Sequence, residues 1–133
     1  MRRVLRWAPP VLFMALIFYL SSQSHPVPEL TEHVWDKLLH FGGYGVLGIL
    51  FYRAFAGEGL SSRRAILLAI LASSLYGATD EWHQAFVPSR SSDVRDWMAD
   101  TAGAALGAIA FAGVAARRQY GLTSDASTST DTA

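Results

Sequence analysis

The 133-residue sequence contains no cysteine and few charged residues. Without cysteine the chain can form no disulfide framework, thiolate metal site or thiol nucleophile, and cysteine usage says nothing about its redox compartment. Only 17% of the residues are charged while 51% are hydrophobic, so a soluble domain of this size would lack the charged surface that water requires. The mean hydropathy is +0.22. The composition therefore favours a protein whose surface is solvated by lipid, and a formal net charge of zero gives no sign of nucleic-acid binding, so we expect none.

Four apolar stretches account for most of the chain, and they span residues 7–22, 38–56, 65–79 and 97–116. Each approaches the roughly 20 residues that a helix needs to cross a bilayer. The third stretch is short, but the stems of Arg63 and Arg64 can reach the interface at one end, and Trp82 suits the headgroup region at the other. A soluble four-helix bundle would need polar outer stripes, and residues 65–72 have none. The sequence therefore predicts an all-α membrane protein, a bundle of four transmembrane helices within residues 1–118.

Residues 119–133 form a tail of a different composition. It is rich in Ser, Thr, Asp, Gly and Ala, and such a segment buries too little apolar surface to offset the entropy of ordering. We expect a disordered polar tail.

The basic residues are unevenly placed around the four apolar stretches, and this predicts their orientation. Eight lie on one side of the expected membrane, namely Arg2, Arg3, Arg6, Arg53, Arg63, Arg64, Arg117 and Arg118. Three lie on the other side, namely Lys37, Arg90 and Arg95. The positive-inside rule therefore places both termini, and with them the polar tail, in the cytoplasm. A cleaved secretory signal is the alternative for residues 7–22, but Pro9 and Pro10 open this stretch and no A-x-A-like site closes it.

Unusual polar residues gather at the outer ends of the second and third stretches. Asp36, His40 and Tyr44 recur every four positions and so share one helix face. If the third helix continues to Phe86, the four residues Tyr76, Asp80, His83 and Gln84 share one side of it while Glu81 sits apart. A carboxylate and an imidazole one turn apart can share a proton, bind a metal or hold a polar headgroup. The alternatives are that His40 merely bonds a neighbouring helix and that the others form a solvated interfacial cap.

The fourth stretch carries acidic residues at its start and glycines further along. Asp93 lies where the helix macrodipole favours a carboxylate. Asp100 lies one turn inside the apolar span, where a charge is expensive and needs a partner. The candidate partners are Arg90, Arg95, Lys37 and His40. Gly103 and Gly107 form a Gly-x-x-x-Gly pair that allows another helix to approach closely.

Together these patterns predict one polar binding site at the outer leaflet. Its expected members are Asp36, Lys37, His40, Asp80, Glu81, His83, Gln84, Arg90, Asp96 and Asp100.

Several of these residues lie in motifs through which the sequence resembles the VanZ-like family of bacterial membrane proteins. The motifs are Phe18-Tyr19-Leu20-Ser21-Ser22-Gln23, Asp36-Lys37-Leu38-Leu39-His40-Phe41 with Gly43-Tyr44, Asp80-Glu81-x-His83-Gln84-x-Phe86-Val87-Pro88-x-Arg90, and Asp96-x-x-Ala99-Asp100-x-x-Gly103. The resemblance extends to about residue 116, and the family often carries Asn at the position of Asp100. The resemblance implies a multi-pass protein of the bacterial cytoplasmic (inner) membrane. The named member of the family is associated with resistance to the glycopeptide teicoplanin.

The sequence leaves three classes of function open. The leading hypothesis is a protein that binds or modifies an envelope component at the outer leaflet, with a cell-wall precursor lipid or a lipid headgroup as its partner besides the bilayer. The alternative is a membrane enzyme acting on a lipid headgroup, by metal-assisted hydrolysis or phosphoryl transfer, with Lys37 and Arg90 as anion clamps. The third is a purely structural helical module. The sequence identifies no metal, cofactor or oligomeric state.

Overall fold

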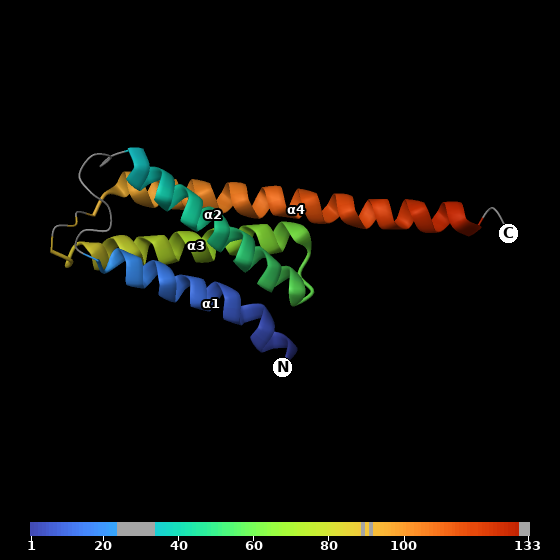
Figure 1. Cartoon of the computed structure of the whole chain (residues 1–133), viewed down its shortest axis with the longest axis horizontal. Coiled ribbons are helices and arrows are strands. Elements are labelled where there is room, and N and C mark those ends of the chain that lie inside the picture. The colour runs from blue at the N-terminus through green and yellow to red at the C-terminus, as the bar shows by residue number, and fades with distance from the viewer. Residues whose placement is uncertain (24–33, 89, 91, 131–133) are drawn as a thin grey trace.

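The computed structural model describes the backbone of all residues except 24–33, 89, 91 and 131–133. Within this described part, the side chains of residues 34–36 and 119–130 are not described. Four α-helices follow one another: α1 (Arg2–Ser21), α2 (Val34–Gly57), α3 (Ser62–Gln84) and α4 (Val94–Thr130). They run alternately in opposite directions along one bundle (Figure 1). The described residues contain no strand, so the expected all-α fold is confirmed.

Helices α2 and α4 form the most extensive contact in the bundle, and glycine makes it possible. A Cβ added to Gly103 would collide with the backbone carbonyl of Phe41, and one added to Gly107 would collide with that of Gly45. Glycine at these positions lets the two backbones touch, as is common where helices pack in membranes. The Gly-x-x-x-Gly pair identified in the sequence thus lies in a helix interface.

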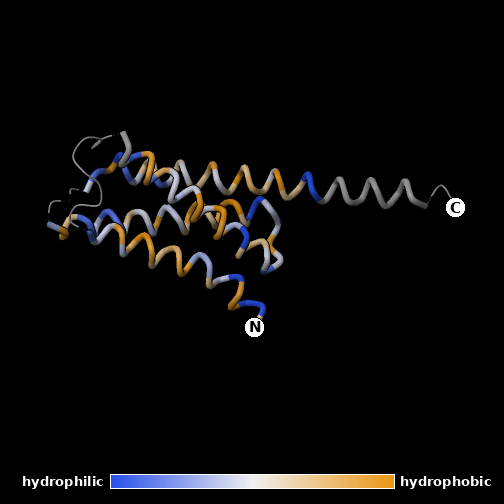
Figure 2. Tube along the Cα trace, viewed as in Figure 1, coloured by the Kyte–Doolittle hydropathy of each residue, from blue (hydrophilic) through white to orange (hydrophobic). Residues whose placement is uncertain are grey.

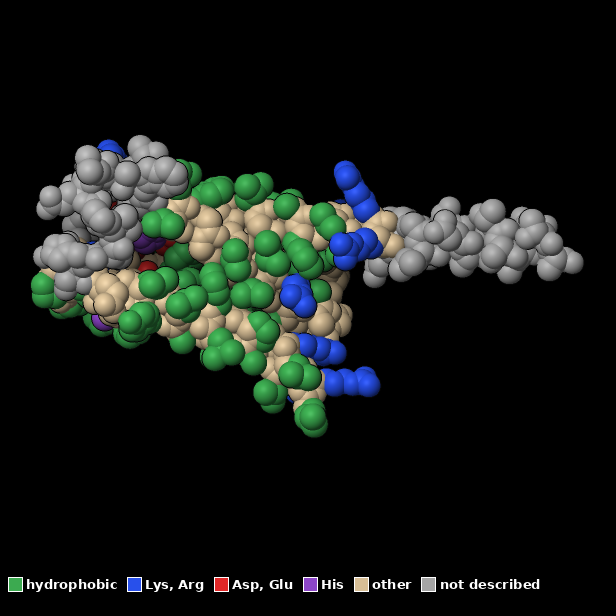
Figure 3. Space-filling view, in the orientation of Figure 1, with side chains coloured by type: hydrophobic (Ala, Val, Ile, Leu, Met, Phe, Trp, Pro, Cys, Tyr) green, Lys and Arg blue, Asp and Glu red, His purple; other side chains and the backbone are tan. Residues whose placement is uncertain are grey.

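The bundle has small side chains inside and large aliphatic ones outside. Four alanines on α3 and α4 are completely buried, namely Ala65, Ala69, Ala104 and Ala108. Large apolar side chains on the same two helices are exposed, namely Leu67, Leu71, Leu75, Leu106 and Ile109. Figure 3 shows hydrophobic side chains along the whole flank of the bundle. Contiguous exposed apolar surface of this extent marks a surface that contacts lipid or protein rather than water.

Hydrophilic residues gather at the two ends of the bundle (Figure 2). At the end where α1 begins, Arg3 Nε lies 3.1 Å from Glu58 Oε2, and Arg6 lies 3.5 Å from the other oxygen of that carboxylate. Lys and Arg side chains project from this end in Figure 3. We call it the basic end, and its residues are Arg2, Arg3, Arg6, Arg53, Arg63, Arg64, Arg117 and Arg118. The opposite end is the acidic end, and its described acidic residues are Asp80, Glu81, Asp93, Asp96 and Asp100.

Three helical segments among the described residues are long and apolar enough to cross a membrane: Arg2–Ser21, Lys37–Gly57 and Val94–Arg118. Helix α3 is not one of them, because Arg63, Arg64, Asp80 and Glu81 at its ends lower its hydropathy. Three of the four predicted spans therefore have the length and composition of a membrane helix.

Helix α4 continues beyond Arg118 into the segment that the sequence predicts as a polar tail. The backbone of α4 is helical through Thr130 and extends past the rest of the bundle (Figure 1). A helix satisfies its backbone hydrogen bonds internally, so it can continue beyond its last tertiary contact. The loop around Val27, with Glu29 and Glu32, lies outside the described residues.

Candidate functional site

Asp80 lies buried at the acidic end, with 3% of its surface exposed, between α3 and α1. Ser21 Oγ donates a hydrogen bond to Asp80 Oδ1 at 2.7 Å, and Gln84 Nε2 donates to Oδ2 at 3.1 Å. Both oxygens of the carboxylate therefore have partners, as a buried polar group requires. The C-terminal turn of α1 supplies one partner and the next turn of α3 the other.

Asp100 is completely buried and is paired with His40 across the α2–α4 interface. His40 Nδ1 lies 2.9 Å from Asp100 Oδ1. His40 is among the four candidate partners named from the sequence, and it contacts Asp100 directly. Gly77 of α3 makes room for the carboxylate, since a Cβ there would lie 3.0 Å from Asp100 Oδ2. A charged residue one turn inside an apolar helix thus has a hydrogen-bonded partner on a neighbouring helix.

Glu81 points away from Asp80, as the helical spacing predicts, but it is also buried, with 6% of its surface exposed. The backbone N–H of Asp93 donates a hydrogen bond to Glu81 Oε2 at 2.8 Å. Consecutive helix positions differ by about 100° in direction. Because α3 packs against both α1 and α4, Asp80 and Glu81 are buried against different neighbours.

Lys37 and two aspartates form ion pairs between the starts of α2 and α4. Lys37 Nζ lies 2.9 Å from Asp96 Oδ1 and 3.7 Å from Asp93 Oδ2. Asp93 also caps α4, because its Oδ1 accepts a hydrogen bond from the backbone N–H of Arg95 at 2.8 Å. That hydrogen bond, with help from Lys37, holds the pKa of the Asp93 carboxyl below its usual value. The cap and the ion pairs fix where α4 begins relative to α2.

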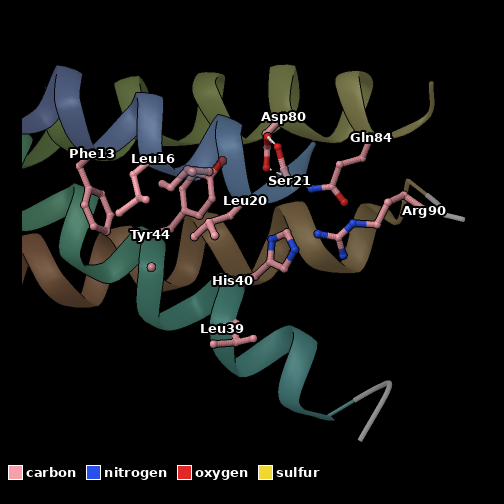
Figure 4. Close-up of a pocket in the computed structure, with 12 residues that line it drawn as sticks. Phe13, Leu16, Leu20, Ser21, Leu39, His40, Tyr44, Asp80, Gln84 and Arg90 are labelled. Atoms are coloured by element: carbon pink, nitrogen blue, oxygen red, sulfur yellow. Dashed lines mark hydrogen bonds between the residues drawn. The ribbon is translucent and has the colours of Figure 1, made fainter. Parts of the chain in front are cut away.

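A cavity of about 420 Å³ lies between α1, α2 and α3 at the acidic end. Its apolar lining residues are Phe13, Leu16, Ile17, Leu20, Leu39 and Gly43. Its polar lining residues are Ser21, His40, Tyr44, Asp80, Gln84 and Arg90. Figure 4 shows Phe13 and Leu16 toward one end, with Tyr44 beside them, and Asp80, Gln84, His40 and Arg90 toward the other, where His40 and Arg90 point toward each other. We call this cavity the amphipathic pocket.

The structure brings most of the predicted site residues to this region. His40, Asp80, Gln84 and Arg90 line the amphipathic pocket. Lys37, Glu81, Asp96 and Asp100 lie in the adjoining hydrogen bonds and ion pairs.

Two predicted residues stand apart. His83 turns toward α1, where its ring stacks on Phe18 with centroids 4.4 Å apart and Nε2 lies 3.1 Å from Ser22 Oγ. The side chain of Asp36 lies outside the described residues.

Sequence reasoning did not include three features of the pocket in the site. Ser21 and the apolar face of α1 form one wall, and Tyr44 forms part of another. The Tyr44 hydroxyl is buried and has no hydrogen-bond partner among the described residues. Its position one turn after His40 is a signal that could have assigned Tyr44 to the site. Leu20 and Ser21 belong to a motif at the end of the first apolar stretch, but the sequence does not say which neighbouring helix that end of α1 meets.

His40, Glu81 and Asp100 could hold a metal ion. Each offers one ligand atom, and these atoms all lie within 4.8 Å of one another. The arrangement as a whole can therefore hold an amphipathic molecule in the pocket, share a proton between His40 and Asp100, or coordinate a cation behind His40.

Comparison with known families adds one finding. The family model described as VanZ/LLP1 matches residues 6–115. Neither the curated proteins nor the solved structures gave a match. The matched range includes every residue that lines the amphipathic pocket.

Proposed function

Since the chain belongs to the VanZ/LLP1 family of membrane proteins, we propose that it is a multi-pass protein of the bacterial cytoplasmic membrane that binds an envelope lipid in the amphipathic pocket. The headgroup of the lipid occupies the polar end, and part of its hydrocarbon chain lies against α1. The observation that carries this proposal is one continuous cavity that joins apolar side chains to buried, hydrogen-bonded polar ones. Pockets for amphipathic ligands combine these two kinds of lining.

In this proposal α3 is a fourth span and both termini are cytoplasmic. A helix of 23 residues is about 35 Å long, which covers the roughly 30 Å hydrocarbon core. The exposed Leu67, Leu71 and Leu75 give α3 an apolar outer face. With the basic end in the cytoplasm, the positive-inside rule is obeyed and the amphipathic pocket lies in the outer leaflet.

The polar lining residues indicate the chemistry of the headgroup. Arg90 can bind a phosphate oxygen, and His40 beside it can donate a second hydrogen bond. Asp80 and Gln84 supply acceptors for a hydroxyl or amine group. We therefore propose a phospholipid headgroup or a cell-wall precursor lipid as the ligand. Bound precursor lipid would change access to the cell-wall surface, so teicoplanin susceptibility is the phenotype to measure.

An enzyme acting on a lipid headgroup is the alternative function. The observation that favours it is His40, which lines the pocket and contacts Asp100 behind it. Such imidazole–carboxylate pairs serve in general acid–base catalysis. Chemical change of the bound lipid, followed by mass spectrometry, would separate this function from binding alone.

Native mass spectrometry of the purified protein tests the binding proposal directly. We expect wild type to retain an envelope lipid, and Leu16→Trp to lose it because the larger ring fills the pocket. Leu12→Trp is the matched control, since Leu12 is exposed on the same helix and does not line the pocket. Asp80→Ala should also lose the lipid while still inserting into the membrane, because insertion depends on the apolar spans. Equal lipid retention by Leu16→Trp and Leu12→Trp would contradict the proposal.

A further inference from the structure

The buried carboxylates of Glu81 and Asp100, close to His40, share an unusual pattern. In each, one oxygen is in a hydrogen bond and the other has no hydrogen-bond partner among the described residues. Glu81 Oε2 accepts the backbone N–H of Asp93, while its Oε1 has no hydrogen-bond partner among the described residues. Asp100 Oδ1 contacts His40, while its Oδ2 likewise has none. Both side chains are more than nine-tenths buried. Burying a carboxylate oxygen without a partner is costly, so these two oxygens favour the binding of a cation.

The three groups meet from three different helices. His40 belongs to α2, Glu81 to α3 and Asp100 to α4, and their ligand atoms all lie within 4.8 Å of one another. The hydrogen bond from Asp93 to Glu81 orients that carboxylate, as outer hydrogen bonds orient the ligands in metal sites. Gly77 keeps the space beside Asp100 Oδ2 open, because a Cβ at this position would lie 3.0 Å from that oxygen.

The charges around the three groups also favour a cation. Two carboxylates meet one imidazole, and Lys37 engages Asp96 and Asp93 at the rim. Arg90 lines the pocket and points toward His40 (Figure 4). A divalent ion would neutralise the two carboxylates and coordinate one oxygen of each.

We propose that His40, Glu81 and Asp100 bind one first-row divalent cation such as Zn²⁺, which ties α2, α3 and α4 together at the acidic end. One nitrogen and two carboxylate oxygens suit Zn²⁺ better than Mg²⁺, which prefers six oxygen ligands and retains its waters. Three protein ligands leave one coordination position open. This proposal rests on the three side chains alone and stands apart from lipid binding, with which it shares only His40.

Zinc titration of chelator-treated protein, carrying a tag without histidine, tests the proposal. We expect about one Zn²⁺ per chain by elemental analysis, a higher melting temperature with Zn²⁺, and reversal of both effects by chelator. Mg²⁺ at the same concentration should shift the melting temperature much less.

Paired variants locate the ion. His40→Ala and Glu81→Gln should lose stoichiometric Zn²⁺ and its thermal shift. The matched controls His83→Ala and Glu58→Gln should keep both, because His83 packs on Phe18 and Glu58 lies at the basic end with Arg3. Asp100→Asn gives a third test, since its amide can keep the contact with His40 while the ligand charge is lost.

Either of two results would overturn the proposal. One is wild-type protein that stays substoichiometric in Zn²⁺ and shows no thermal shift. The other is monodisperse His40→Ala and Glu81→Gln protein that binds Zn²⁺ like wild type. The Leu16→Trp variant separates the two proposals, because it should lose lipid and still bind Zn²⁺.

Discussion

Asp100 is accommodated inside an apolar helix by one specific partner. Its carboxylate contacts His40, and the missing side chain of Gly77 leaves it room. On insertion scales a lone charge at the centre of a membrane helix costs about 2.5 to 3.5 kcal/mol. A hydrogen-bonded partner reduces that cost, which explains why the pair is buried as a unit.

This pairing predicts different outcomes for two substitutions of Asp100. Asp100→Asn should be tolerated for folding, because the amide oxygen can still accept a hydrogen bond from His40. Asp100→Leu should lower the melting temperature, because it removes the hydrogen bond between Asp100 and His40 in a dry environment, at a cost of about 1 to 3 kcal/mol. Monodispersity and melting temperature of both variants in one detergent check this. A Leu variant at least as stable as wild type would show that the contact with His40 contributes nothing.

At the scale of the elements, the α2–α4 contact sets the spacing of the whole bundle. The backbones touch at Gly103 and Gly107, and the same two helices carry His40 and Asp100. If these helices were further apart, the imidazole would lose its contact with the carboxylate. The glycines therefore support the site without contributing any chemistry to it.

We predict that Gly107→Ala destabilises the bundle while Gly113→Ala does not. A methyl group at Gly107 meets the backbone of Gly45, and overpacking of this kind costs about 1 to 3 kcal/mol. Gly113 lies on the same helix, and a methyl group added there would have no atom within 4 Å. Alanine at Gly113 should therefore be neutral or gain up to about 1 kcal/mol of helix propensity. Thermal unfolding in detergent measures both variants, and equal melting temperatures would mean that α2 and α4 can separate without cost.

For the whole molecule, the decisive question is which side of the membrane each end faces. The basic end and the acidic end lie at opposite ends of the bundle. The proposed site is accessible to envelope components only if the acidic end faces outward. Topology and function are therefore tested together.

Single-cysteine labelling can test this topology cleanly, because the chain has no native cysteine. We predict that Ser92→Cys reacts with a membrane-impermeant maleimide in intact spheroplasts and that Ser61→Cys reacts only after lysis. Both serines are exposed, and α3 alone separates them in the described helices. Labelling of both positions from the same side would exclude α3 as a span.

The sequence by itself determined the helical class, the four apolar segments, the family and the segregation of basic and acidic residues. Composition and charge pattern are properties of the sequence itself, so they can be recognised without knowing which helices are in contact. The sequence also indicated most of the polar residues near the pocket, because helical spacing reveals which of them share a face, as for His40 and Tyr44.

Only the tertiary structure decided which partner each polar group meets. Asp100 had four candidate partners within reach, and the close α2–α4 packing selected His40. Glu81 and Asp80 are neighbours in sequence, yet α4 and α1 bury them on different sides. The apolar wall of the pocket comes from α1, and the sequence does not say which neighbouring helix that wall meets. These choices depend on how helices far apart in sequence pack together, and no local pattern encodes that packing.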